Sequence, residues 1–302
     1  MGIDYHGLRF IQLVASHSPL GATATLGRQH IDVSSRQIAA AIGVPTSPEF
    51  GPYCEQLLMT CFGASSVDSF DMSDYEGSTF KCDLNSPLVT DRQFDTVIDL
   101  GTIEHIFNIA QAFQNAIALC RVGGRIVHVL PANNFPGHGF WQISPELFFA
   151  LYSEKNGFRD TEVYVAELSR TDIWWRALQP SGGTRAEFSG RARAYIMAYT
   201  TKTHAMPNLV VQQSGYEVSW KRGRSALVGF SDFARRERVR KRISRIPFFW
   251  RFANSLVPNQ SGHADASLYR LSGNPGFKKV LISELMKVYT SNFLSSYRDP
   301  MP

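Results

Sequence analysis

The chain has 302 residues, of which 44% are hydrophobic and 19% charged. This composition excludes disorder throughout and allows one large domain with an appended piece. The net charge of +5 is local, because residues 235–245 hold seven basic side chains and one acid. No run approaches the about 18 apolar residues of a membrane helix, and the N-terminus lacks a signal-peptide pattern. We therefore expect a cytoplasmic protein without general nucleic-acid binding.

Strand-like and helix-like segments alternate through the first two-thirds of the chain. The strands expected in chain order are residues 22–26, 66–70, 79–82, 94–100, 125–130, 161–167 and 192–200. The helices expected between them are residues 34–42 (capped by Ser34 or Ser35), 53–61, 109–120 and a helix that begins at Ser144-Pro145-Glu146. Alternation of this kind predicts an α/β fold, with a doubly wound, mostly parallel sheet and helices on both faces.

Three segments depart from simple alternation. Gly123-Gly124 is expected to end the helix before the strand at 125–130, and residues 174–190 resemble an inserted loop. The last two strands, joined without an obvious helix, are expected to form a hairpin at one edge of the sheet. After about Thr203 the sequence becomes basic and less periodic. We therefore expect a domain over residues 1–203 and a partly helical, basic extension over residues 204–302.

Acidic residues follow three of the expected strands. Asp71, Asp83 and Asp99 stand at or just beyond strand ends. Ligands of an open doubly wound sheet bind beyond the carboxyl ends of its strands. A carboxylate there can accept paired hydrogen bonds from ribose hydroxyls or from an adenine amine. The pattern predicts a ligand that resembles a nucleoside.

The stretch FDTVIDLGTIEHIFN, residues 94–108, precedes a Gly-Gly turn and the strand RIVHVLP. It resembles the class I methyltransferases that use S-adenosylmethionine, in the branch with a Glu-His pair after the fourth strand. The resemblance extends from about Gly21 to Thr200, and residues 133–148 are similar to bacterial relatives of this branch. It implies a Rossmann-like fold with a seven-stranded sheet, S-adenosyl-L-methionine as the cofactor, and methyl transfer as the activity.

The resemblance also implies roles for particular residues. Asp71 would bind the ribose hydroxyls, and Asp83 would face the adenine together with the Leu84 backbone. The methionine end of the cofactor would lie near the turn after the fourth strand. The residues implied at that turn are Asp99, Gly101 and Thr102.

The first loop departs from the family pattern, in which glycines let the backbone approach the cofactor. In LGRQHID, residues 26–32, only Gly27 remains, and Arg28, Gln29 and His30 stand where small residues are expected. Three explanations are open: a re-routed loop, cofactor or substrate contacts made by Arg28 and His30, or loss of cofactor binding. Gly27 and Arg28 are counted among the cofactor-binding candidates.

Histidines near the expected strand ends are candidates for a general base. A hydroxyl acceptor gains from such a base, and His138 and His105 are the leading candidates, with His30 as a third. Glycines on both sides of His138 indicate a tight loop near a ligand, although a purely structural turn explains them too. Glu104 and His105 have an alternative explanation as the start of a helix, where an acid is favoured.

Aromatic residues 174 and 175, with Arg176, have two interpretations. Their side chains either line an acceptor pocket by stacking on a ring or cover the edge of the sheet. The segment 235–252 sets apolar residues at helical spacing on a basic background. It predicts either peripheral contact with an anionic membrane or a solvated face whose apolar stripe packs on the main domain. No motif for nucleic-acid recognition accompanies it.

The first hypothesis is an S-adenosylmethionine-dependent methyltransferase that methylates oxygen on a small molecule or glycan precursor. The alternative is a catalytically degenerate domain of this fold that acts as a binding or interaction protein. A nicotinamide-dependent oxidoreductase would need a Gly-x-Gly-x-x-Gly turn after the first strand, and that turn is absent. The four cysteines are scattered without a CxxC pair, so neither a zinc cluster nor a disulfide framework is indicated and no metal site is expected.

Overall fold

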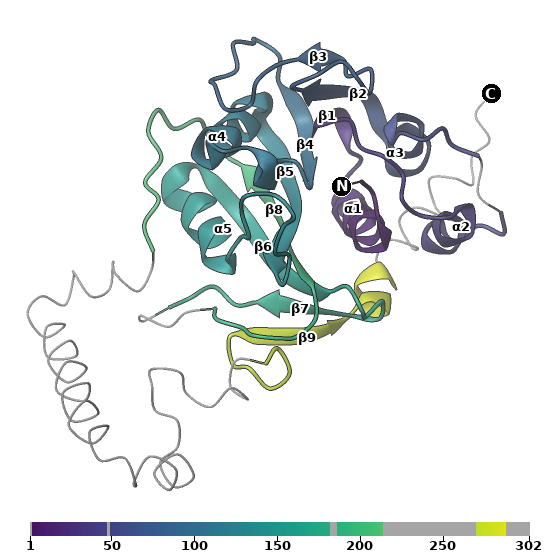
Figure 1. Cartoon of the computed structure of the whole chain (residues 1–302), viewed down its shortest axis with the longest axis vertical. Helices are drawn as coiled ribbons and strands as arrows, with labels where there is room; N and C mark the ends of the chain where they lie inside the picture. Colours follow the sequence, from purple (N-terminus) through teal and green to yellow (C-terminus); the bar gives the residue numbers. More distant parts are fainter. Residues whose placement is uncertain (1, 47–48, 182–185, 214–269, 288–302) are drawn as a thin grey trace, which may run out of the picture.

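The computed structural model describes residues 2–46, 49–181, 186–213 and 270–287, and these form one nine-stranded sheet with helices on both faces (Figure 1). The strands are β1 (Gly21–Leu26), β2 (Ala64–Asp71), β3 (Phe80–Lys81), β4 (Phe94–Leu100), β5 (Cys120–Asn133), β6 (Phe158–Glu167), β7 (Ile173–Ala177), β8 (Ala194–Lys202) and β9 (Phe277–Leu281). The helices are α1 (Tyr5–His17), α2 (Ser35–Ile42), α3 (Glu55–Phe62), α4 (Ile109–Leu119), α5 (Pro145–Leu151) and the short 3₁₀ turns η1 (Ile103–His105) and η2 (Glu154–Asn156).

The strand order is β3-β2-β1-β4-β5-β8-β6-β7-β9. The first five strands of this order run parallel to one another. Strand β8 is antiparallel to both β5 and β6. The predicted fold class, a mostly parallel Rossmann-like sheet, is confirmed. The sheet has nine strands and not seven, because β7 and β9 continue it beyond the β6–β8 pair.

Two hydrophobic layers cover the sheet. Helices α4 and α5 bury residues such as Phe113 and Phe148 against one face, and α1, α2 and α3 bury residues such as Leu8, Ile38 and Leu57 against the other. Figure 1 shows these two groups of helices on opposite sides of the strands. Buried apolar area of this kind is the main source of stability of such a fold.

Most expected elements lie where the sequence places them, and their ends follow local chemistry. Ser34 caps α2 through a capping box with Gln37, and Ser144 caps α5, which begins with proline. The Gly123-Gly124 pair lies inside β5 and not before it, which corrects the expectation. A side chain at Gly124 would approach the Asp95 carbonyl oxygen to 3.0 Å, so the glycine lets β5 pass close to β4.

The expectation of a loop over residues 174–190 is wrong at its start. Residues 173–177 form β7, and Trp174 and Trp175 are both buried. The Trp174 indole donates a hydrogen bond to His6 Nδ1 at 3.0 Å, and Arg176 pairs with Glu162 at 2.9 Å. These side chains therefore belong to the core and the sheet, and the acceptor-pocket interpretation of them is not supported.

The region after residue 203 contributes to the sheet. β9 pairs antiparallel with the whole of β7, from Ile173 opposite Leu281 to Ala177 opposite Phe277. The basic segment 235–252 lies outside the described residues, as does the helix expected there. Among the described residues, the helices are too short or too polar to span a bilayer.

Candidate active site

The carboxyl ends of the parallel strands meet along one rim of the sheet. Leu26, the last residue of β1, lies opposite Phe70 in β2 and opposite Asp99 in β4. The Gly27 amide donates to the Phe70 carbonyl at 2.7 Å, and Asp71 lies opposite Lys81 in β3. The loops that carry the predicted cofactor-binding residues therefore leave the sheet side by side, as expected for a ligand at this rim.

Asp71 and Asp83 each hold a turn and keep acceptor capacity. Oδ1 of Asp71 accepts the Ser73 amide at 3.2 Å. Oδ1 of the exposed Asp83 accepts the Asn85 amide at 2.9 Å and the Asn85 side chain at 2.8 Å, and these bonds lower the pKa of Asp83. Leu84, beside it, is buried in the core. Among the described residues, Oδ2 of each aspartate has no protein donor, so both remain open to a ligand.

Asp99 has a different environment from the other two acids. Its side chain is fully buried, and Oδ1 accepts the Thr102 amide at 3.0 Å. Oδ2 lies 2.8 Å from His128 Nδ1, and the other imidazole nitrogen lies 2.6 Å from the Tyr152 hydroxyl. Asp99 therefore fixes the turn after β4 through its side chain, and its predicted place near the methionine end of the cofactor stays a prediction. Burial also raises the pKa of Tyr152.

The turn after β4 touches the first loop directly. Thr102 Oγ1 donates to the Leu26 carbonyl at 2.6 Å. Gly27 has a φ of +69°, and a side chain there would lie 2.7 Å from Thr102 Oγ1. Gln29 turns its side chain inward, where Nε2 donates to the Leu26 carbonyl at 2.6 Å. Its Oε1 is buried and has no donor among the residues that the structure describes. Gly27 is thus required both for its backbone conformation and for this close approach.

Arg28 and His30 join the first loop to neighbouring elements. Arg28 Nε donates to Glu55 at 2.7 Å, Nη1 donates to the Glu76 carbonyl, and the guanidinium lies 3.9 Å from the centre of the Tyr53 ring. His30 Nε2 lies 2.8 Å from Glu76 Oε1. Of the three explanations left open by the sequence, these contacts favour a re-routed loop, because both basic side chains are used by the protein.

Glu104, His105 and His138 form a cluster at the next part of the rim, which we call the Glu-His cluster. Glu104 and His105 lie on η1, and His138 lies in the loop between β5 and α5. Oε1 of Glu104 is 3.5 Å from His138 Nε2 and 3.8 Å from His105 Nε2. The two candidate bases, 33 positions apart in the printed sequence, are thus brought together by the fold, with ring centres 5.1 Å apart.

The glycine-flanked loop is held against Glu104 through its backbone. The amides of Phe140 and Trp141 both point to the Glu104 carbonyl, at 2.8 and 3.3 Å. Gly139 has a φ of +73°, and a side chain there would lie 2.8 Å from that same carbonyl oxygen. The expectation of a tightly folded loop is confirmed, and its tightness positions His138 over Glu104.

Electrostatics single out Glu104, which the sequence offered as part of a Glu-His pair after the fourth strand or as the start of a helix, without a catalytic or binding role of its own. Its side chain is fully buried, and within the described part of the chain neither carboxylate oxygen has a hydrogen-bond donor. Burial, with a contribution from Asp99, raises the pKa of Glu104 to about 8. Burial also lowers the pKa of His105 and of His138, so both imidazoles favour the neutral form.

Exposed aromatic side chains lie beside the Glu-His cluster. Phe107 is 74% and Phe140 67% exposed, and their rings meet edge to face at 6.1 Å. The Trp141 indole donates to the Ile106 carbonyl at 3.0 Å. We call these three residues the aromatic ledge. Large exposed aromatic groups next to candidate catalytic residues are typical of a surface that binds a substrate ring.

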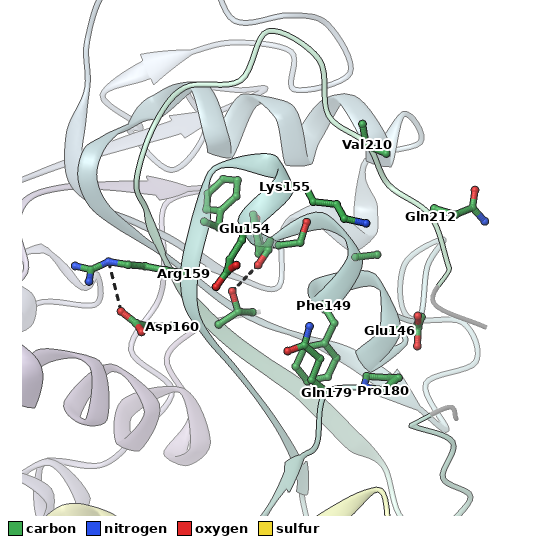
Figure 2. A pocket seen from close by; sticks show the side chains of 15 residues that line it. Glu146, Phe149, Glu154, Lys155, Arg159, Asp160, Gln179, Pro180, Val210 and Gln212 are labelled. Carbon is green, nitrogen blue, oxygen red and sulfur yellow. Dashed lines mark hydrogen bonds and ion pairs between the residues drawn. The ribbon is translucent and has the colours of Figure 1, made fainter. Parts of the chain in front are cut away.

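A separate cavity of about 460 Å³ opens between α5, η2 and β6 (Figure 2). It is lined by charged residues such as Glu154 and Lys155, with Arg159 and Asp160 paired at 3.6 Å on its border. None of the predicted cofactor or catalytic residues lines it. We therefore place the candidate reaction at the rim and not in this cavity.

Comparisons with known proteins concern the fold. No family model matches the chain, and no curated protein gives a significant match. The chain is similar to a solved SAM-dependent methyltransferase from Thermotoga maritima (14% identity, 66% of this chain and 90% of that chain, TM-score 0.35). It is also similar to the N-methyltransferase NodS from Bradyrhizobium japonicum with bound S-adenosyl-L-homocysteine (10% identity, 66% of this chain and 88% of that chain, TM-score 0.35). A third similar structure is the 1,6-didemethyltoxoflavin-N1-methyltransferase from Burkholderia thailandensis (15% identity, 66% of this chain and 78% of that chain, TM-score 0.36). The sequence identities and TM-scores are low, so the evidence for function lies in the residues of this chain.

A substitution of Gly139 tests the contact that positions His138. We expect Gly139→Ala to lower the free energy of unfolding by about 2–3 kcal/mol, because a β-carbon at positive φ costs about 1–2 kcal/mol and this one also meets the Glu104 backbone. Gly137→Ala is a matched control, since Gly137 has a φ of +81° but open space around it. Urea unfolding measures both variants. Equal destabilisation by the two would contradict a special contact at Gly139.

Proposed function

We propose that this chain is an S-adenosylmethionine-dependent methyltransferase that transfers a methyl group to oxygen of a small molecule or glycan precursor. The observation that carries the proposal is that Asp71 and Asp83 share one rim of the sheet with the Glu-His cluster. A nucleoside-binding half and a proton-accepting half would then lie next to each other. That arrangement suits a cofactor and an acceptor aligned for displacement.

The residues present at the rim fit this cofactor, which supplies an electrophilic methyl group on a sulfonium. Asp71 would accept the ribose hydroxyls through Oδ2, and Asp83 with the Leu84 backbone would face the adenine. Gly27, Gly101 and Thr102 would lie along the methionine end. Oε1 of Gln29, which is buried and lacks a donor within the described part of the chain, supports the fit, because it offers an acceptor beside Gly27 for a ligand that carries N–H groups.

The Glu-His cluster would handle the proton of the acceptor. The lowered pKa values of His138 and His105 keep an imidazole nitrogen free at neutral pH. Such a nitrogen accepts the proton of an acceptor hydroxyl as its oxygen attacks, and a general base of this kind contributes about 10²–10⁴ in rate. The His138 side chain is 36% and the His105 side chain 45% exposed, so an acceptor can approach both rings, with His138 Nε2 itself buried toward Glu104.

The aromatic ledge favours an acceptor with a planar or apolar face. Phe107 and Phe140 are exposed and mutually packed, so they offer a preformed surface at little entropic cost. Stacking there would leave an attached hydroxyl close to the two imidazoles. We therefore infer that phenolic compounds, or sugars attached to an apolar group, are the first acceptors to test.

One observation supports the alternative of a binding protein without catalysis. The Arg28 side chain joins the first loop to Glu76 in the loop after β2, where the family pattern has small residues. Calorimetric titration with S-adenosylhomocysteine separates the two functions. We expect micromolar binding of S-adenosylhomocysteine. In a separate reaction that contains S-adenosylmethionine as the methyl donor, we expect a mass increase of one methyl group on a phenolic acceptor. Absence of binding at millimolar ligand would favour the alternative.

A further inference from the structure

The carboxylate of Glu104 is a buried group without a partner. It is fully buried, and its two oxygens have no donor among the residues that the structure describes. His138 Nε2, which faces it, is also buried and has no hydrogen-bond partner within residues 2–46, 49–181, 186–213 and 270–287. Buried polar groups are nearly always satisfied, and a buried carboxylate without a partner is costly. Glu104 Oε1 and His138 Nε2 are unsatisfied atoms that face each other, which is the arrangement expected of two ligands of one bound group.

A hydrogen bond within the cluster does not account for these atoms. Glu104 Oε1 is 3.5 Å from His138 Nε2 and 3.8 Å from His105 Nε2. Hydrogen bonds between nitrogen and oxygen are about 2.7–3.2 Å long. The ion pair of His30 with Glu76, at 2.8 Å, shows the ordinary distance in the same molecule. The gaps in the Glu-His cluster are too long for direct bonds.

From this geometry we infer that Glu104, His105 and His138 bind one divalent transition-metal ion. Zinc lies about 2.0–2.2 Å from nitrogen and oxygen ligands, so two ligands of a tetrahedral site are about 3.4 Å apart. The separations of 3.5 and 3.8 Å are close to that value, and one ligand atom from each residue lies within 4.8 Å of the others. Small side-chain rotations would close the site.

The ligand types define the class of ion. Imidazole nitrogens suit zinc, iron, cobalt or nickel, whereas magnesium and calcium favour sites built from oxygen alone. A site with two imidazoles and one carboxylate therefore selects a first-row transition metal. The three ligands also leave coordination positions open, as in catalytic metal sites.

The surrounding structure holds the ligands in place and leaves one side accessible. The backbone bonds of Phe140 and Trp141 to the Glu104 carbonyl fix the loop of His138 relative to η1. Both histidine side chains are partly exposed next to the aromatic ledge. With the ion bound, both imidazoles would serve as ligands and not as the general base, and an oxygen of the acceptor would reach the open coordination positions from that side. This role of the ion rests on the proposed function, whereas the existence of the metal site does not.

Metal titration of the full chain tests the inference. The protein is dialysed against EDTA and titrated with Co²⁺, followed by visible absorption, and with Zn²⁺, followed by calorimetry. We expect one equivalent of each ion to bind. Mutation of a residue that only supports a metal ligand lowers metal affinity about 10–100-fold. Loss of a ligand itself, in Glu104→Gln or His105→Gln, should therefore lower the affinity at least about 100-fold. Because the His105 side chain is 45% exposed, His105→Gln should fold normally.

His30→Gln is the matched control. His30 also faces a carboxylate, but Glu76 has no second imidazole beside it, so metal affinity should not change. Thermal unfolding in EDTA verifies that every variant is folded. Failure of Co²⁺ and Zn²⁺ to bind at millimolar concentration would overturn the inference, as would equal affinities of the wild type and His105→Gln. Titration with S-adenosylhomocysteine is read separately, so loss of the proposed methyltransferase function and loss of the metal site are distinguishable.

Discussion

Asp71→Ala is expected to weaken the binding of S-adenosylhomocysteine about 100-fold. One carboxylate that accepts two ribose hydroxyls makes charge-assisted hydrogen bonds, each worth about 1.5–3 kcal/mol, and 1.4 kcal/mol corresponds to a tenfold change. Oδ2 of Asp71 has no donor among the described residues, so a ribose hydroxyl can bond to it without displacing a hydrogen bond of the protein. Isothermal titration of the wild type and the variant measures the difference directly.

The control for Asp71 lies in the same loop. The Asp74 side chain is 82% exposed, and its carboxylate has one long contact among the described residues, at 3.9 Å from Lys81 Nζ. Asp74→Ala removes the same charge from the same loop, and we expect its affinity to stay within about twofold, since exposed ion pairs contribute little. Equal losses in both variants would assign the effect to the charge of the loop and would remove the ribose role of Asp71.

His128→Ala is expected to lower the free energy of unfolding by about 3–5 kcal/mol. The change removes one partner of a buried, hydrogen-bonded pair and leaves Asp99 without compensation. The uncompensated atom is Asp99 Oδ2, since Oδ1 keeps the Thr102 amide. The change also leaves the Tyr152 hydroxyl without its 2.6 Å partner and opens a cavity in the core. Urea unfolding followed by circular dichroism measures the loss.

His17→Ala serves as the comparison, because His17 is an exposed residue at the end of α1. Its removal costs one hydrogen bond to the Leu13 carbonyl and should lower the free energy of unfolding by about 0.5–1.5 kcal/mol, well below the loss expected at His128. The His128 variant should also bind S-adenosylhomocysteine more weakly, since Asp99 shapes the turn that carries Thr102. A loss below about 1 kcal/mol in His128→Ala would mean that the Asp99–His128–Tyr152 network is dispensable for folding.

Elements with strong local patterns were predictable from the sequence. The strand at 94–100 coincides with β4 because its residues form a near-continuous apolar run. The tight loop around His138 was predictable because glycines tolerate positive φ, and both neighbours of His138 adopt it. The rim that carries Asp71 and Asp83 was also predictable from strand ends, because the carboxyl ends of parallel strands lie at the same edge of a sheet.

Features that depend on contacts between distant segments were not predictable. Helix α1 was missed, although Asp4 caps it and its apolar residues repeat at helical spacing. β7 was taken for a loop because Pro, Ser and Gly residues follow it, and its strand character depends on pairing with β6 and β9. The role of Asp99 depends on His128, which lies on the adjacent strand.

The same limit applies to the Glu-His cluster. Glu104 stands beside His105 in the sequence, but its complete burial follows from the loop that covers it. The expectation of no metal site rested on the scattered cysteines. Histidines 33 positions apart form no recognisable ligand spacing, and only the fold brings them to one carboxylate.

The pairing of β9 with β7 has a consequence for shortened forms of this protein. Strand β9 satisfies the backbone groups of residues 173–177 that face away from β6. A chain that ended near residue 210 would leave this border of the sheet unsaturated, next to the buried indoles of Trp174 and Trp175. An uncovered strand of this kind recruits further strands from other molecules. Trimming the chain at its apparent change in composition would thus promote self-association.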